Sequence, residues 1–211
     1  MDIESFVKEK ITWLGHASFR IDGSKSIVYI DPWKLKSAKP ADVVCITHSH
    51  FDHLSEEDVA RIRKATTTII GPPDCKASFG DSFKPIAPGQ SLSVGDVKVE
   101  AVPSYNTDKD FHPKKNNWVG YIVTVDGVRI YHVGDTDMIP EMAGTNADVA
   151  LIPVGGTYTM TVKQAAEAVN KINPKVAVPM HCADIVGTLD DRDKFKAATS
   201  AKVVILDPTD R

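Results

Sequence analysis

The chain has 211 residues, 42% of them hydrophobic, and a formal net charge of −3. This length predicts one domain over residues 1–211, long enough to bury a sizeable core. The charge disfavours nucleic-acid and membrane partners, which would require a basic surface. No apolar run approaches the roughly 18 residues of a transmembrane helix, and the N-terminus lacks a signal-peptide core, so we expect a soluble cytoplasmic protein.

The first part of the chain reads as a β-hairpin followed by strand–helix alternation. The Asp22-Gly23 pair is typical of a hairpin turn, and Ser55 before three acidic residues is typical of a helix start. The expected elements are strands at 11–19 (broken at Gly15), 26–30, 42–47 and 67–70, and a helix from 55 to about 64. Residues 72–90 carry scattered Pro and Gly and give no clear pattern.

The second part repeats this order. The expected strands lie at 91–94, 97–102, 118–125, 128–133, 148–153, 176–180 and 202–206, with helices at 161–171 and 190–198. Residues 104–117 are polar and aperiodic, and a loop this much longer than the usual 4–6 residues or so is often functional. Hairpins followed by strand–helix alternation in each half favour an α+β fold, with two sheets face to face and helices outside them. That arrangement has four layers.

The strongest local signal is the stretch 47–53, Thr-His-Ser-His-Phe-Asp-His, which directly follows the apolar run 43–46. It holds three of the seven histidines of the chain, His48, His50 and His53, together with the carboxylate of Asp52. Imidazole and carboxylate ligands suit zinc and also admit manganese or iron. A polar turn is the alternative, but turns favour Gly, Asn, Asp or Pro over three histidines.

Further candidate ligands follow other expected strands. Asp31, Asp135 and His181 each stand at a strand end, where loops meet and ligands bind in α/β architectures. Taken singly, they could be a turn former, a cap and a half-buried histidine. His16, at the strand break, could reach the same site, and His112, in the long loop, could also be merely solvated. His132, inside a strand, is expected to be structural or to support the ligands. The three cysteines form no CxxC pair, which argues against a disulfide framework.

The stretch 47–53 resembles the HxHxDH signature of the metallo-β-lactamase superfamily, and Asp31, Gly134-Asp135-Thr136 and His181 follow in the expected order. Within the superfamily, Trp13-Leu-Gly-His-Ala-Ser, Asp31-Pro32 and Pro153-Val-Gly-Gly-Thr-Tyr resemble small metal-dependent hydrolases related to ascorbate-6-phosphate lactonase. The resemblance implies a four-layer αβ/βα sandwich, in agreement with the strand and helix pattern.

The resemblance also implies a binuclear centre of two divalent ions, Zn²⁺ or Mn²⁺, with Fe²⁺ admitted by the same ligands. His48 and His50 would hold the first ion, Asp52, His53 and His181 the second, and Asp135 would bridge them. The family's remaining ligand to the first ion is a histidine near residues 102–106, where this chain has Asn106. Either His112 replaces it, or Asn106 is a weak oxygen ligand, or the first site is incomplete. We favour His112.

The function implied is hydrolysis of a small-molecule ester, lactone or phosphoester by a metal-bound hydroxide. Asp52 would orient the hydroxide, Asp31 would fix the ligand loop, and Tyr158 or His16 would donate a hydrogen bond to the developing oxyanion. The long loop also carries lysines that could meet an anionic substrate, or could be merely solvated: Lys109, Lys114 and Lys115. The alternatives are a metal-dependent phosphodiesterase or nuclease, and a metal-binding protein without turnover. The sequence gives no indication of oligomeric state.

Overall fold

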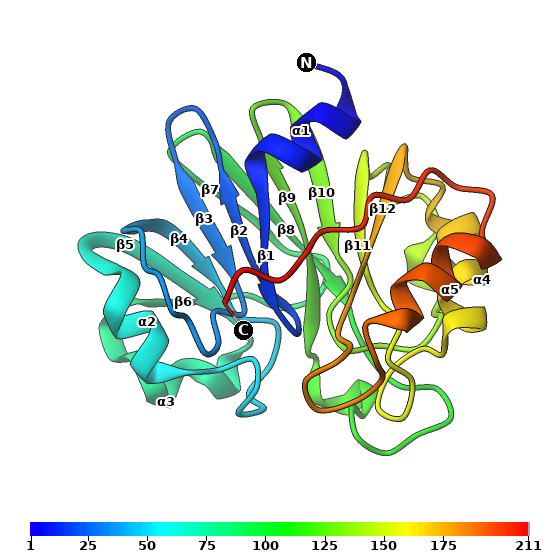
Figure 1. Cartoon of the computed structure of the whole chain (residues 1–211). Helices are drawn as coiled ribbons and strands as arrows, with labels where there is room; N and C mark the ends of the chain where they lie inside the picture. Colours follow the sequence, from blue (N-terminus) through cyan, green and yellow to red (C-terminus); the bar gives the residue numbers. More distant parts are fainter. Residues whose placement is uncertain (211) are drawn as a thin grey trace.

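The computed structural model describes residues 1–210 and contains two six-stranded sheets that face each other, with helices on their outer sides (Figure 1). The first sheet runs, in order, β1 (Ile11–Gly15), β2 (Ser18–Asp22), β3 (Ile27–Ile30), β4 (Ala41–Cys45), β5 (Arg63–Gly71) and β6 (Phe83–Pro85). The second runs β12 (Val176–Met180), β11 (Val149–Pro153), β10 (Val128–His132), β9 (Val119–Val125), β8 (Val97–Pro103) and β7 (Ser91–Val94). The expected α+β sandwich is confirmed.

Of the five α-helices within residues 1–210, four lie on the outer sides of the two sheets, and the N-terminal one lies at their upper end in Figure 1. The α-helices are α1 (Ile3–Lys10), α2 (Glu56–Ile62), α3 (Lys76–Phe79), α4 (Val162–Ile172) and α5 (Asp190–Ala198), and short 3-10 turns span Pro73–Cys75, Gly80–Ser82, Lys114–Asn116 and Pro140–Met142. Figure 1 shows α2 and α3 beside the first sheet and α4 and α5 beside the second, so the layers run αβ/βα. α4 begins with a capping box, in which the Thr161 side chain accepts from the Gln164 N–H, as the sequence predicts.

Both sheets combine antiparallel and parallel pairing. Strands β1, β2 and β3 pair antiparallel with one another, whereas β3 to β6 run parallel to one another. In the second sheet β7 to β10 are antiparallel neighbours, and β10 to β12 run parallel. Because β3 and β4 run parallel in one sheet, and β10 and β12 run in the same direction in the other, the loops after each set leave from one edge of its sheet.

The apolar residues of β4, with Ile46 directly after it, show how the layers are joined. Val43 and Cys45 belong to the core cluster that reaches both sheets, whereas Val44 and Ile46 pack in a separate cluster with Val59 of α2. Successive side chains of a strand point to opposite faces, so a continuously apolar strand predicts burial on both sides. Each such side chain contributes roughly 1.5–3 kcal/mol on full burial. This burial fixes the strand whose end carries the histidine-rich loop.

Three segments differ from expectation. The strand expected at 11–19 is a tight hairpin of β1 and β2, which turns at His16 and Ala17. The strand expected at 202–206 is wrong: Val203 makes one isolated parallel bridge to Ala177, after which the chain leaves the sheet edge. Helix α1 was not expected, although Asp2 caps it and Phe6 and Val7 bury their side chains beneath it. Residues 72–90 contain α3 and β6.

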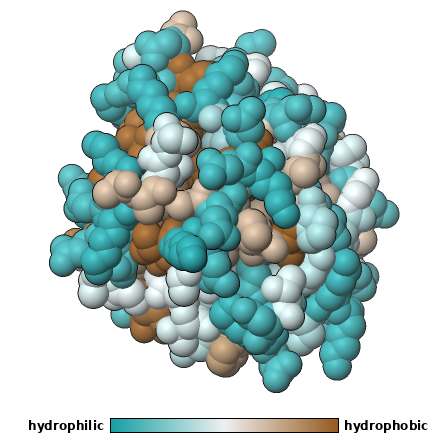
Figure 2. All heavy atoms as spheres, turned by 90° about the vertical axis from the view of Figure 1, so that its right-hand side faces the viewer, coloured by the Kyte–Doolittle hydropathy of each residue, from teal (hydrophilic) through white to brown (hydrophobic). Residues whose placement is uncertain are grey.

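Figure 2 views the molecule from the side that carries α4 and α5 in Figure 1. Hydrophilic residues dominate this face, with smaller hydrophobic areas between them (Figure 2). α4 follows the usual amphipathic pattern: it buries Ala165, Ala168, Val169 and Ile172 against the second sheet and leaves polar residues outside. Within residues 1–210, every helix is too short or too polar to cross a bilayer.

Candidate metal centre

The candidate ligands converge where strands from both sheets end. The histidine-rich loop follows β4, Asp135 follows β10 and His181 follows β12. His16, Asp31 and His181 adopt positive φ angles of 50°, 46° and 54°. This left-handed conformation is uncommon for residues other than glycine and is often found at functional sites. Here it turns the chain sharply at the strand ends, and the His181 N–H donates to the His16 carbonyl at 2.8 Å, which joins the two sheets.

One group of possible ligands consists of His48, His50 and His112, whose ring nitrogens lie within 4.8 Å of one another. His48 and His112 are buried. Burial lowers the pKa of His48 well below its ordinary value and lowers the pKa of His112 to about 4. Both rings are therefore neutral near pH 7, which is the state a metal ligand requires.

A second group consists of His16, Asp52, His53 and His181, also within 4.8 Å of one another. His16 Nε2 lies 2.9 Å from Asp52 Oδ2. Burial alone would raise the pKa of Asp52, but the hydrogen bond from His16 and the charge of His53 lower it to about 2. Asp52 is therefore a carboxylate at neutral pH, and it is only partly buried beside the centre.

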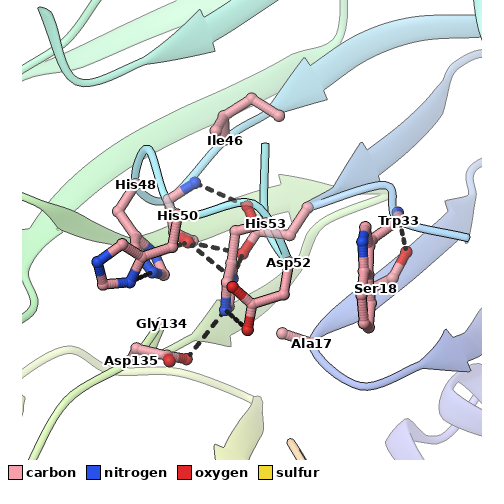
Figure 3. Close-up of polar contacts among 12 residues, drawn as sticks. Ala17, Ser18, Trp33, Ile46, His48, His50, Asp52, His53, Gly134 and Asp135 are labelled. Carbon is pink, nitrogen blue, oxygen red and sulfur yellow. Dashed lines mark hydrogen bonds and ion pairs between the residues drawn. The ribbon is translucent and has the colours of Figure 1, made fainter. Parts of the chain in front are cut away.

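Asp135 faces both groups; Figure 3 shows its carboxylate beside His53. Its Oδ2 is 3.4 Å from His112 Nε2 and 2.9 Å from His181 Nε2, and its Oδ1 is 3.5 Å from His53 Nε2. Burial alone would raise the pKa of Asp135, but His181 and His53 hold it well below the ordinary value. A single carboxylate thus faces histidines of both groups.

The residues present fit a metal ion, as their unpaired atoms show. His53 Nε2, His112 Nε2, His181 Nε2 and Asp135 Oδ1 are buried without a hydrogen-bond partner. Buried polar atoms in proteins are normally paired, because leaving one unpaired costs about 1–3 kcal/mol. These atoms converge on the same space, where a cation would take their lone pairs. Burial alone would lower the pKa of His53, but the charges of Asp135 and Asp31 raise it well above its ordinary value, and a metal ion at Nε2 would take the place of the proton that these charges favour.

Asp31 contacts the histidine-rich loop through both of its carboxylate oxygens. Its Oδ1 accepts from the Thr47 N–H at 2.7 Å, and its Oδ2 accepts from Thr47 Oγ1 at 2.6 Å and lies 2.7 Å from His53 Nδ1. A carboxylate at Nδ1 favours the proton on that nitrogen, which leaves the His53 Nε2 lone pair toward Asp135. Figure 3 shows His53 beside Asp135 and on the same loop as His48, His50 and Asp52.

The structure places His112, rather than Asn106, beside His48 and His50. Asn106 Oδ1 accepts from the His112 backbone N–H at 2.9 Å and lies 2.9 Å from His112 Nδ1. Its Nδ2 donates to the Tyr158 carbonyl at 3.0 Å, and its backbone N–H donates to the His112 carbonyl at 2.8 Å. These bonds fold the long loop back over the centre. Asn106 is thus placed to support His112, with its own oxygen directed away from a ligand position.

Other predicted residues lie farther from the reacting space. His16 is buried against Asp52 and does not line the cavity beside the centre. His132 Nε2 donates to the Ala17 carbonyl at 2.8 Å, a structural role. Lys109 pairs with Asp137 and Lys114 pairs with Glu141, and Lys115 is exposed. None of these three lysines lines the cavity.

A cavity of about 280 Å³ opens onto the centre. Three residues of the two groups, His50, Asp52 and His112, form part of its lining together with Asp135. The rest of its lining is largely apolar and consists of Phe51, Phe111, Tyr158 and Ile185. Tyr158 was expected near the site from sequence, and its ring meets Phe111 edge-on with centroids 4.7 Å apart.

Sequence reasoning missed Trp118 and Asp74. The Trp118 ring lies 4.9 Å from that of His48 and 4.8 Å from that of His50, and its Nε1–H donates to Asp74 Oδ2 at 2.9 Å. The same Asp74 oxygen accepts from Ser49 Oγ at 2.7 Å. Through these contacts, Trp118 and Asp74 support His48, Ser49 and His50. The only sequence signal was a tryptophan directly after the long polar loop.

Comparison with known proteins agrees with this geometry. A family model described as a β-lactamase superfamily domain matches residues 10–181. A UPF0173 metal-dependent hydrolase from Pyrococcus furiosus is 38% identical, with 94% of this chain and 96% of the relative covered. A crystal structure of a protein assigned as a metal-dependent hydrolase from Parabacteroides distasonis superposes with a TM-score of 0.83 at 33% identity, covering 92% of this chain and 91% of that one. A metallo hydrolase from Ignicoccus hospitalis has a TM-score of 0.77 at 27% identity and 94% coverage of both chains. The chain belongs to the metallo-β-lactamase superfamily and, within it, to the UPF0173 metal-dependent hydrolases.

Proposed function

We propose that this enzyme hydrolyses a small-molecule ester, lactone or phosphoester at a centre of two divalent metal ions, Zn²⁺ or Mn²⁺, with Fe²⁺ also accommodated. The observation that carries the proposal is the position of Asp135, which faces histidines of both ligand groups beside a cavity of about 280 Å³. This volume lies just below the usual range for small-molecule sites, about 300–1,000 Å³, which fits a small substrate. The resemblance of the motifs to those of ascorbate-6-phosphate lactonase supports a lactone among these substrates.

The ligand roles follow from the two groups. His48, His50 and His112 would hold one ion, Asp52, His53 and His181 would hold the other, and Asp135 would contact both. Such ions, when bound, polarise a carbonyl or phosphoryl oxygen and lower the pKa of water to roughly 7. No activated serine or cysteine is then required, in agreement with the absence of a Gly-x-Ser-x-Gly motif from the sequence.

Two further side chains face the substrate space. Asp52 lines the cavity as a carboxylate, and His16 holds its Oδ2, so it can orient an attacking water and accept its proton. The Tyr158 phenol is on the cavity wall, where it can donate a hydrogen bond to a developing negative charge. His16 lies behind Asp52, so we assign it a positioning role in place of direct contact with the substrate.

The test uses full-length protein and a panel of esters, lactones, phosphomonoesters and phosphodiesters, assayed before chelation, after chelation and after re-addition of Zn²⁺ or Mn²⁺. We expect turnover of at least one ester or lactone, its loss with chelator and its return with metal. Folded, metal-loaded protein that cleaves no member of the panel would contradict the proposal and favour a metal-binding protein without turnover. Cleavage of RNA, with binding that weakens steeply as salt rises, would favour the nuclease alternative.

A further inference from the structure

Apolar side chains that are exposed to water border the opening of the cavity. Phe51 is 72% exposed, Phe111 48% and Ile185 39%. They are three of the five exposed large hydrophobic residues found among residues 1–210, and all three line this one cavity. Single exposed apolar residues are ordinary, but a contiguous group beside a functional site indicates a binding surface.

The three residues come from three separate loops. Phe51 lies within the histidine-rich loop after β4, Phe111 within the long loop between β8 and β9, and Ile185 between β12 and α5. Phe51 meets the Trp33 ring at 6.2 Å, and Phe111 meets Tyr158 at 4.7 Å. Local sequence does not explain why these three loops bring apolar side chains to the same opening. The ring contacts give Phe51 and Phe111 defined positions.

The same lining lacks positive side chains. Among residues 1–210, no lysine or arginine lines the cavity, and two lysines of the long loop, Lys109 and Lys114, are paired with Asp137 and Glu141. A substrate with a phosphate or carboxylate away from the scissile bond would therefore find no side-chain cation in this lining. An aromatic ring or branched alkyl chain would instead remove Phe51, Phe111 and Ile185 from water.

We propose that the substrate carries an uncharged apolar group, an aromatic ring or short alkyl chain, next to the hydrolysed bond, and that Phe51, Phe111 and Ile185 bind this group. The inference rests on the proposed function, which places the hydrolysed bond over His50, Asp52, His112 and Asp135. It deepens that proposal by naming the substrate class: an aryl or alkyl acyl compound in preference to a phosphorylated or carboxylated one. A partner protein on this surface is the competing explanation, and the test below separates the two.

The test measures equilibrium binding of three hydroxamic acids to metal-loaded protein by calorimetry. Acetohydroxamate and benzohydroxamate share a metal-chelating head and differ by an aromatic ring, and 4-carboxybenzohydroxamate adds a charge to that ring. Burial of about half of the ring surface predicts that benzohydroxamate binds about tenfold more tightly than acetohydroxamate. The carboxylated ring should lose most of this gain. Phe51→Ala and Phe111→Ala should each reduce the ratio of benzohydroxamate to acetohydroxamate affinity to about threefold or less.

Leu189→Ala is the matched control, because Leu189 is also 39% exposed but does not line the cavity, so the ratio should stay near tenfold. An affinity ratio near one in wild type, tighter binding of the carboxylated ring, or no binding of any hydroxamate overturns the inference. A ratio unchanged by both phenylalanine variants overturns it as well and leaves the patch to a partner protein. A ring preference without hydrolysis of any panel substrate contradicts the proposed function alone, whereas hydrolysis with a ratio near one contradicts this inference alone.

Discussion

The substitution Asp31→Asn replaces one carboxylate oxygen by an NH₂ group in a side chain that holds the histidine-rich loop. Asp31 is fully buried and its carboxylate holds Thr47 through the backbone N–H and Oγ1, and His53 through Nδ1. If asparagine keeps its oxygen on the Thr47 N–H, its NH₂ group faces His53 Nδ1. Two donors then oppose each other, and the conflict is relieved when the His53 proton moves to Nε2. The protonated Nε2 of His53 then has no lone pair to offer a metal ion beside Asp135.

The expected cost follows from these contacts. A hydrogen bond to a charged group contributes about 1.5–3 kcal/mol, and loss of the outer partner of a metal-binding histidine typically lowers metal affinity about 10–100-fold. That fold-change corresponds to about 1.4–2.7 kcal/mol, in agreement with the loss of one charged hydrogen bond. We therefore expect Asp31→Asn to weaken binding of the ion that His53 would hold about 10–100-fold in competition with a fluorescent chelator.

The assay has a second readout that a merely structural effect would not move. Long-range ¹⁵N spectra of the histidine rings should show His53 protonated at Nδ1 in metal-loaded wild type and shifted toward Nε2 in the variant. Asp42→Asn is the control, because that carboxylate also accepts from a backbone N–H and a lysine, but at the start of β4. Metal affinity within threefold of wild type, or an unchanged His53 tautomer, would refute the reasoning.

Three further predictions follow from single contacts. Gly155→Ala would place a Cβ against the His181 carbonyl oxygen and displace His181. We expect at least a tenfold loss of metal affinity by chelator competition, and wild-type affinity would show that the backbone can shift without moving His181. Asn106→Ala frees the ring and backbone N–H of His112, and metal affinity should fall about 10–100-fold, whereas an unchanged value would mean that the loop alone positions the ring. Cys45 is fully buried and burial raises the pKa of its thiol, so peptide mapping should show iodoacetamide labelling only after unfolding; rapid labelling of native protein would contradict its burial.

Much of the candidate site could be predicted because its ligands stand at the ends of strongly patterned strands. The apolar run before His48 predicts buried β4, and the parallel strands carry Asp135 and His181 to the same place. The periodic segments at 161–171 and 190–198 became α4 and α5 for similar reasons: a capping box in α4 and acids in the first turn of α5. The sequence pattern was enough to predict a strand or helix where its apolar residues and its capping residues indicated the same element.

The remaining features depend on contacts far apart in the sequence. The run 202–206 reads as a strand, but it finds a pairing partner only at Ala177. The choice between Asn106 and His112 depends on how a long loop closes, through the hydrogen bond between their own backbones. Nor does any periodicity distinguish Phe51 and Phe111, exposed at the cavity mouth, from aromatic residues of the core.

Metal stoichiometry tests the central claim, two ions on either side of Asp135, most directly. Plasma mass spectrometry of wild type, His112→Ala and His181→Ala, each loaded and then desalted, would count the ions that each chain retains. We predict two ions in wild type and about one in each variant, because the two histidines belong to different ligand groups. Wild type that retains no more than one ion, or a His112→Ala variant that keeps both at wild-type affinity, would contradict the account.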